Sequence, residues 1–263
     1  MSDVVAAGLS MYMVRWHCIR TLVVVLGLSV AAWPRPGEAY LLFDGMKDYV
    51  EIPDAKEFSV STAGGLTISA WIRPDALIAR TPEGSGYVHW MGKGERGRLE
   101  WVFRMYSRDN AERRENRISF YVFNPAGGLG VGSYFQDPAR GGEWIHVVGM
   151  ADREKTSIYK NGVLRKSDVY LGAITPAHGT APVRIGTRDL HSFFAGGIRA
   201  IRIWNRPLTM AEVADLFRSG RVAREGLVAE YLLNETAGDV AHDIAGGHHG
   251  RVHTATWMPD PER

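Results

Sequence analysis

Cysteine is almost missing from this chain of 263 residues, which contains only Cys18. Without a second cysteine, no disulfide bond can form within the chain. Stability must therefore come from a hydrophobic core or from a bound metal. The 45% content of hydrophobic residues is ordinary for a soluble globular protein and is sufficient for such a core.

An excess of charge of one sign is also missing. The chain has 31 basic and 29 acidic residues, a formal net charge of +2. This balance gives no electrostatic reason to expect nucleic acid or an anionic membrane as a partner. The most charged run, Arg108–Arg117 (RDNAERRENR), mixes both signs and is typical of a solvated loop.

Long hydrophobic runs are missing as well. The apolar run Thr21–Trp33 is too short to cross a bilayer comfortably. It follows Arg15 and Arg20 and precedes the small residues of Gly37-Glu38-Ala39. This order predicts a secretory signal peptide over residues 1–39, with an uncleaved anchor as the alternative. We therefore expect a secreted protein, extracellular or periplasmic, with no membrane span after cleavage.

The remaining chain, residues 40–263, is rich in period-two patterns, in which apolar and polar residues alternate as in half-buried strands. Asn161-Gly162 is the pair that a two-residue hairpin turn prefers. One capping box, Thr209 to Glu212, starts the single convincing helix. The sequence predicts an all-β fold, an antiparallel two-sheet β-sandwich (jelly roll) with one short helix, in one domain. The strands are expected in Leu66–Pro74, Tyr87–Gly92, Leu99–Tyr106, Arg117–Phe123, Glu143–Asp152, Thr156–Gly162, Pro182–Thr187, Gly197–Asn205 and Leu227–Leu233.

The first stretch of this domain, Leu41–Pro53, reads LLFDGMKDYVEIP. Apolar residues alternate on both sides of an Asp-Gly pair, which is a frequent turn sequence. The pattern predicts an entry hairpin, with Leu42 and either Val50 or Ile52 facing the core.

Six blocks of the sequence occur in a familiar order. They are FDGMKDYVEIP, LTISAWIRPD, WIHVVGMAD, IYKNGV, VRIGT and FFAGGIRAIRIWNRPLTMAEVADLF. In this order they resemble the laminin-G-like, concanavalin A-like jelly-roll domains of secreted proteins. The resemblance implies two antiparallel sheets, in many members a structural calcium ion, and a binding role toward glycans or glycoproteins. It does not imply one particular ligand, because fold does not fix function.

Asp44 and Asp48 are the candidate metal ligands. Calcium binds six to eight oxygen atoms, and these two carboxylates with the carbonyl groups of the turn could supply part of that set. Where relatives carry oxygen-bearing side chains, however, this chain has Lys47 and Arg199. The alternatives are that Asp44 stabilises the turn, that Asp48 is solvated or paired with Lys47, or that Arg199 neutralises an aspartate in place of the ion.

A candidate ligand face follows from the alternation of two strands. If Trp101, Phe103 and their period-two neighbours are buried, the intervening side chains face outward. Aromatic rings beside an arginine suit sugar recognition; the alternative is a second small core covered by a loop such as 124–140. The predicted ligand-face residues are Glu100, Arg104, Tyr106, Tyr121 and Phe123.

Motifs of catalysis are missing: the chain has no Gly-x-Ser-x-Gly, no His-Glu-x-x-His and no phosphate-binding loop. The histidines near the C-terminus could suggest zinc, but they fit a turn that the resemblance already explains. We expect a non-enzymatic binding module for carbohydrate or glycosylated surfaces. The alternatives are a protein-binding adhesion domain and a glycan-active hydrolase or lyase. The histidines in question are His242, His248, His249 and His253.

Overall fold

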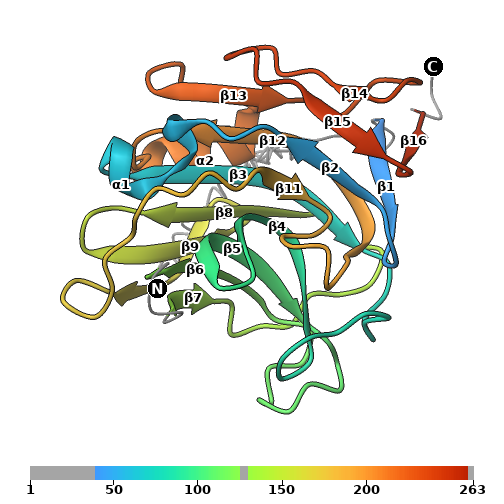
Figure 1. The fold of residues 1–263 in the computed structure, drawn as a ribbon, viewed down its shortest axis with the longest axis horizontal. Coiled ribbons are helices and arrows are strands. Elements are labelled where there is room, and N and C mark those ends of the chain that lie inside the picture. Colours follow the sequence, from blue (N-terminus) through green and yellow to red (C-terminus); the bar gives the residue numbers. More distant parts are fainter. Residues whose placement is uncertain (1–38, 125–129, 260–263) are drawn as a thin grey trace, which may run out of the picture. The chain divides into compact units, whose positions relative to one another are not determined.

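The computed structural model describes residues 39–124 and 130–259. Apart from Ala39, the predicted signal peptide lies outside the described residues. The described part contains sixteen strands in two sheets, two α-helices and one 3₁₀ turn (Figure 1). The elements are β1 (Tyr40–Asp44), β2 (Tyr49–Ile52), η1 (Lys56–Phe58), α1 (Val60–Ala63), β3 (Leu66–Pro74), β4 (Tyr87–Glu95), β5 (Arg98–Tyr106), β6 (Ile118–Phe123), β7 (Gly130–Tyr134), β8 (Ile145–Ala151), β9 (Lys155–Lys160), β10 (Val163–Val169), β11 (Val183–Ile185), β12 (Ala195–Trp204), α2 (Met210–Ser219), β13 (Leu227–Tyr231), β14 (Val240–Ala241), β15 (Gly250–His253) and β16 (Thr256–Met258).

Two eight-stranded antiparallel sheets pack face to face. The first has the order β10-β9-β8-β3-β12-β1-β16, with β13 also paired to β12. The second has the order β14-β15-β2-β11-β4-β5-β6-β7. The core between them is built by alternate residues of the strands, such as Trp101, Phe103 and Met105 of β5 and Ile118 and Phe120 of β6. The predicted sandwich is therefore confirmed.

The outer face of the first sheet carries the helix predicted from its capping box. Thr209 accepts a hydrogen bond from the amide of Glu212, and the Glu212 carboxylate accepts one from the amide of Thr209, as the sequence indicated. Val213 and Leu216 of α2 then pack with Trp204 of β12 in a second, smaller core. One short helix, α1, was not predicted, because its single turn has no amphipathic pattern of useful length.

The entry hairpin predicted for Leu41–Pro53 is wrong. β1 pairs with β12 and β16 in the first sheet, whereas β2 pairs with β11 and β15 in the second sheet. The turn between them carries the chain across the sandwich. Leu41 and Phe43, not Leu42, face the core from β1, while Val50 and Ile52 face it from β2.

The other predicted hairpin is confirmed. Asn161 and Gly162 both adopt positive φ angles, 52° and 77°, and join β9 to β10, where Lys160 pairs with Val163. Among the helices of the described residues, none is long and apolar enough to cross a membrane.

Candidate functional site

Three of the predicted ligand-face residues lie together on the outer face of the second sheet. The guanidinium carbon of Arg104 lies 4.3 Å from the ring centroid of Tyr87, 4.6 Å from that of Tyr121 and 5.5 Å from that of Phe123. Arg104 is thus held between the rings of two tyrosines, a cation–π arrangement. In the described part of the chain its guanidinium makes no hydrogen bond or ion pair, and its Nε is buried.

Two glycines of β7 make room for this group. Gly132 pairs with Tyr121 and Gly130 pairs with Phe123 across the β6–β7 ladder. A Cβ on Gly132 would come within 2.4 Å of the Tyr121 Cγ, and one on Gly130 would come within 2.5 Å of the Phe123 Cε1. Both rings therefore lie across the backbone of the neighbouring strand, which fixes their orientation beside Arg104.

Tyr106 belongs to the same group but is fully buried. Arg114, from the loop between β5 and β6, donates one hydrogen bond to the Tyr106 hydroxyl (2.8 Å) and another to the Tyr121 hydroxyl (3.1 Å). Burial raises the pKa of Tyr106 well above its usual value, and the neighbouring Tyr121 raises it further. A loop therefore covers this end of the face, although it is not the loop named from the sequence.

Glu100 lies apart from the other four. It is buried, pairs with Lys93, and accepts hydrogen bonds from the Ser59 hydroxyl (2.6 Å) and the Gly179 amide (2.9 Å). Four residues along a strand correspond to roughly 13 Å, so the strand itself separates Glu100 from Arg104. The structure brings together Arg104, Tyr106, Tyr121 and Phe123; that this face binds a ligand stays a prediction.

The carboxylates of Asp44 and Asp48 accept hydrogen bonds from backbone amides of the turn that joins the two sheets. Asp44 Oδ1 accepts hydrogen bonds from the amides of Met46 (2.8 Å), Lys47 (3.0 Å) and Asp48 (3.3 Å). Asp48 accepts one bond from the Asp44 amide (2.9 Å) and another from the Thr254 hydroxyl (2.7 Å). Burial alone would raise the pKa of Asp44, but the three amide donors outweigh it and hold that pKa below its usual value.

These contacts leave few oxygen atoms for a calcium ion. Three of the four carboxylate oxygens already accept hydrogen bonds, and the Arg80 guanidinium donates to the Asp44 carbonyl (3.1 Å). The arrangement fits a carboxylate-stabilised turn better than a cage of six to eight oxygens. Arg199 lies on β12 four residues beyond Ala195, the strand partner of Asp44, and its guanidinium carbon is 4.3 Å from the Trp144 ring centroid. The calcium predicted at Asp44 and Asp48 stays untested, and these hydrogen bonds favour the alternative prediction that Asp44 stabilises the turn.

The C-terminal histidines have structural contacts of two kinds, a turn held by Asp243 and a ring stack. The Asp243 carboxylate accepts hydrogen bonds from the amides of Glu230, Ala245, Gly246 and His248, with distances of 2.8 to 3.1 Å. His253 stacks on Tyr49 instead, at 4.2 Å between ring centroids. Within residues 39–124 and 130–259, the one group of side chains with the spacing of metal ligands is Glu83, His89 and Asp189.

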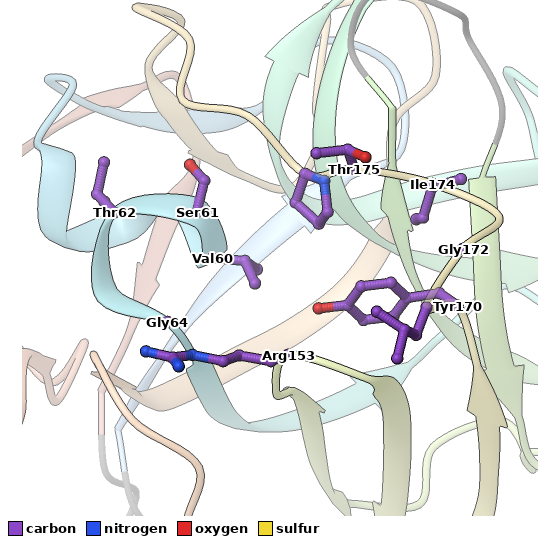
Figure 2. Close-up of a pocket in the computed structure, with 11 residues that line it drawn as sticks. Val60, Ser61, Thr62, Gly64, Arg153, Tyr170, Gly172, Ile174 and Thr175 are labelled. Carbon is purple, nitrogen blue, oxygen red and sulfur yellow. The ribbon is translucent and has the colours of Figure 1, made fainter.

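A hollow of about 460 Å³ opens between α1, the β8–β9 turn and the segment after β10 (Figure 2). This volume is in the usual range for ligand pockets. Its floor is the edge of the main core, formed by Val60, Tyr170 and Ile174, which are nearly inaccessible. Its walls carry hydroxyl groups of Ser61 and Thr175.

Arg153 forms one wall of this hollow. Its side chain extends toward Gly64, which ends α1 with a φ of 72° (Figure 2). A Cβ on Gly64 would lie 3.2 Å from the Arg153 guanidinium, so a glycine both ends the helix and admits the arginine. The guanidinium makes no hydrogen bond or ion pair with any described residue. No sequence pattern indicates this pocket, because its residues come from three short segments without a shared pattern.

Two antiparallel sheets packed face to face form an architecture that lectin domains share with several other kinds of protein. A laminin-G family model, described as the concanavalin A-like lectin/glucanases superfamily, matches residues 44–214. The chain belongs to this superfamily, and the predicted resemblance is confirmed. No curated protein matches the chain.

Solved structures with the same fold are only distantly similar in sequence. One is a protein of Bacteroides ovatus ATCC 8483 proposed to bind carbohydrate, with 19% identity and a TM-score of 0.62 over 85% of this chain and 60% of that one. Another is the heptameric SAP-like pentraxin of Limulus polyphemus, with 12% identity and a TM-score of 0.52 over 83% of this chain and 96% of that one. A third is the receptor binding domain of a botulinum neurotoxin C/D mosaic serotype, with 12% identity and a TM-score of 0.52 over 77% of this chain and 47% of that one. The chain spans less than two thirds of the Bacteroides protein, and these similarities show the fold alone.

Proposed function

We propose that this protein is a secreted, non-enzymatic carbohydrate-binding module, and that the pocket beside Arg153 holds the sugar. Membership in a lectin-type superfamily and the similarity to a Bacteroides protein proposed to bind carbohydrate support the ligand class. The observation that carries the site is the Arg153 guanidinium, which reaches along the pocket wall without a partner among the described residues.

The chemistry of the pocket favours a sugar that carries a carboxylate. The apolar floor suits the C–H face of a sugar ring, and the wall hydroxyls suit its hydroxyl groups. A guanidinium offers two parallel N–H groups to a carboxylate, which is its preferred partner. A glycan or glycoprotein bearing uronic or sialic acid is therefore the expected partner.

A glycan-array screen of the purified protein, followed by calorimetry on the best ligand, tests this proposal. Losing a charge-assisted contact costs about 1.5 to 3 kcal/mol, so we expect Arg153→Ala to weaken binding by roughly 10- to 100-fold. Arg251→Ala is the matched control, because Arg251 is an exposed arginine on β15 and does not line the pocket. Tyr121→Ala tests the predicted ligand face in the same assay.

Three outcomes would contradict the proposal. Binding to no glycan would remove the carbohydrate function, and a loss with Tyr121→Ala but not with Arg153→Ala would move the site to the outer face of the second sheet. Binding to a protein ligand alone would favour the adhesion alternative, for which Leu171, 65% exposed at the pocket rim, is a plausible contact.

A further inference from the structure

A buried polar cluster lies next to the Arg104 group, and neither the core nor the proposed sugar pocket explains it. His89 projects from β4, Glu83 comes from the loop before that strand, and Asp189 comes from the loop after β11. Glu83 Oε1 lies 2.7 Å from His89 Nδ1, and Asp189 Oδ1 lies 4.0 Å from the same nitrogen. The three ligand atoms lie within 4.8 Å of one another.

The buried atoms of this cluster are not all satisfied. The His89 side chain is fully buried and that of Asp189 is 3% exposed. Asp189 Oδ1 has no hydrogen-bond partner in the described part of the chain, although it faces His89. Leaving a buried polar atom unpaired costs about 1 to 3 kcal/mol, so such an atom calls for an explanation. A carboxylate oxygen without a hydrogen-bond partner, 4.0 Å from an imidazole nitrogen, has the chemistry of a metal ligand, and an ion there would take the place of the hydrogen that His89 Nδ1 shares with Glu83.

We propose that Glu83, His89 and Asp189 bind a first-row transition metal of the zinc class. Ligands of a tetrahedral zinc, each about 2.0 to 2.1 Å from the ion, lie roughly 3.4 Å apart. The separations of Glu83 Oε1 and Asp189 Oδ1 from His89 Nδ1, 2.7 and 4.0 Å, each lie within about 1 Å of that value, and all three ligand atoms lie within 4.8 Å of one another. Ser192 Oγ lies 3.3 Å from His89 Nδ1 and 3.4 Å from Glu83 Oε1, beside the fourth position.

The donor set selects against calcium. Calcium takes oxygen ligands almost exclusively, whereas an imidazole nitrogen with two carboxylates suits zinc and its neighbours in the periodic table. The His89 side chain is fully buried, and the neutral imidazole that such burial favours is a common zinc ligand. This site is therefore distinct in position and in chemistry from the calcium predicted at Asp44 and Asp48.

Two arginines limit the affinity of the site. Arg188 Nη2 pairs with Asp189 Oδ2 and lies 3.8 Å from Glu83 Oε1, and the charge of Arg104 also acts on Glu83 and His89. Arg188 pairs with Oδ2 of Asp189 and leaves Oδ1 available. Carboxylates that bind metals are commonly held by a neighbouring hydrogen-bond donor in this way. Its closeness to Glu83 opposes a cation, so we expect weaker binding than in a site of neutral surroundings.

Metal titration of the purified full chain, after dialysis against a chelator, tests the proposal. We expect one zinc ion per chain by calorimetry, a rise in the melting temperature with zinc but not with calcium, and a visible cobalt absorption of tetrahedral intensity. Glu83→Gln and Asp189→Asn keep the size of each side chain, and we expect either to weaken zinc binding at least tenfold. Glu95→Gln, on an exposed part of β4, is the control and should bind zinc as the wild type does.

Several results would overturn this site. They are no stoichiometric zinc in the wild type, equal zinc binding by Glu83→Gln and the wild type, or a preference for calcium. Because a buried variant can fail to fold, circular dichroism accompanies each titration. The cobalt spectrum of the wild type needs no variant, and its absence alone would refute the proposal. Loss of glycan binding in Arg153→Ala does not bear on this site, since the two lie on different elements.

Discussion

Replacing Asp44 by alanine should destabilise the protein without any involvement of calcium. The carboxylate accepts hydrogen bonds from three amides of the turn that joins β1 to β2. A hydrogen bond to a charged group contributes about 1.5 to 3 kcal/mol in buried surroundings. Because Asp44 is half-exposed and one oxygen serves all three donors, we expect a total loss of about 2 kcal/mol for Asp44→Ala. Asp44→Asn retains an acceptor and should lose less than about half of that.

The measurement is thermal and denaturant unfolding of the wild type and both variants, with chelator and with added calcium. For a domain of this size, about 2 kcal/mol corresponds to a fall in melting temperature of roughly 4 to 8 °C. An ion present at 100 times its dissociation constant would add about 2.7 kcal/mol, which the same assay resolves easily. We expect the wild-type stability to be the same in both solutions.

The pH dependence gives an independent check. The pKa of Asp44 is lowered in the folded state, so its stabilisation is present above the unfolded value of 3.8 and is lost as the pH falls below it. Asp44→Ala should lack this part of the acid destabilisation. A calcium-dependent rise in wild-type stability that Asp44→Asn abolishes would refute the explanation and establish the ion.

Two further predictions concern stability. Arg202 and Glu230, 2.7 Å apart and nearly inaccessible, pair β12 with β13. Glu230 also pairs with Arg224 (2.8 Å) and would keep that partner, so Arg202→Met should cost about 1 to 3 kcal/mol in denaturant unfolding. Adding Glu230→Leu should recover most of that loss, and a double variant as unstable as the single one would contradict this account. Glu212, whose pKa the hydrogen bond from Arg206 lowers to about 2, should stabilise α2 above pH 4.5 and lose this effect as the pH falls toward 2. Glu212→Gln should then lower the free energy of unfolding by about 1 kcal/mol at neutral pH and leave it unchanged near pH 2. An equal loss at both pH values would contradict this account.

Local patterns predicted most of the fold. The alternation of β5, the Asn161-Gly162 turn and the capping box at Thr209 each depend on neighbours a few residues away, and each has the predicted structure. The entry hairpin failed because the sequence of a tight turn does not specify which sheet receives the next strand. Asp44 and Asp48 shape a turn that crosses the sandwich, and only the pairing of β1 with β12 reveals this.

The sites were harder to predict than the fold. Alternation placed Arg104 and Glu100 on one face, but it could not show that Glu100 is buried against Lys93 or that Arg114 covers Tyr106. No sequence pattern indicated the Glu83–His89–Asp189 group, because Asp189 lies in the loop after β11, a hundred residues after His89 along the chain. Such groups depend on the order of strands that are distant along the chain, and local sequence patterns do not predict that order.

The strand order also determines when the protein can finish folding. β16 pairs with β1 in the first sheet, and β15 pairs with β2 in the second, so the last strands to be synthesised complete both layers around the first. Contacts between such distant parts of a chain form slowly, because a large loop must close before they contribute. The sandwich is therefore complete only when segments from both ends of the described chain have paired in the two sheets.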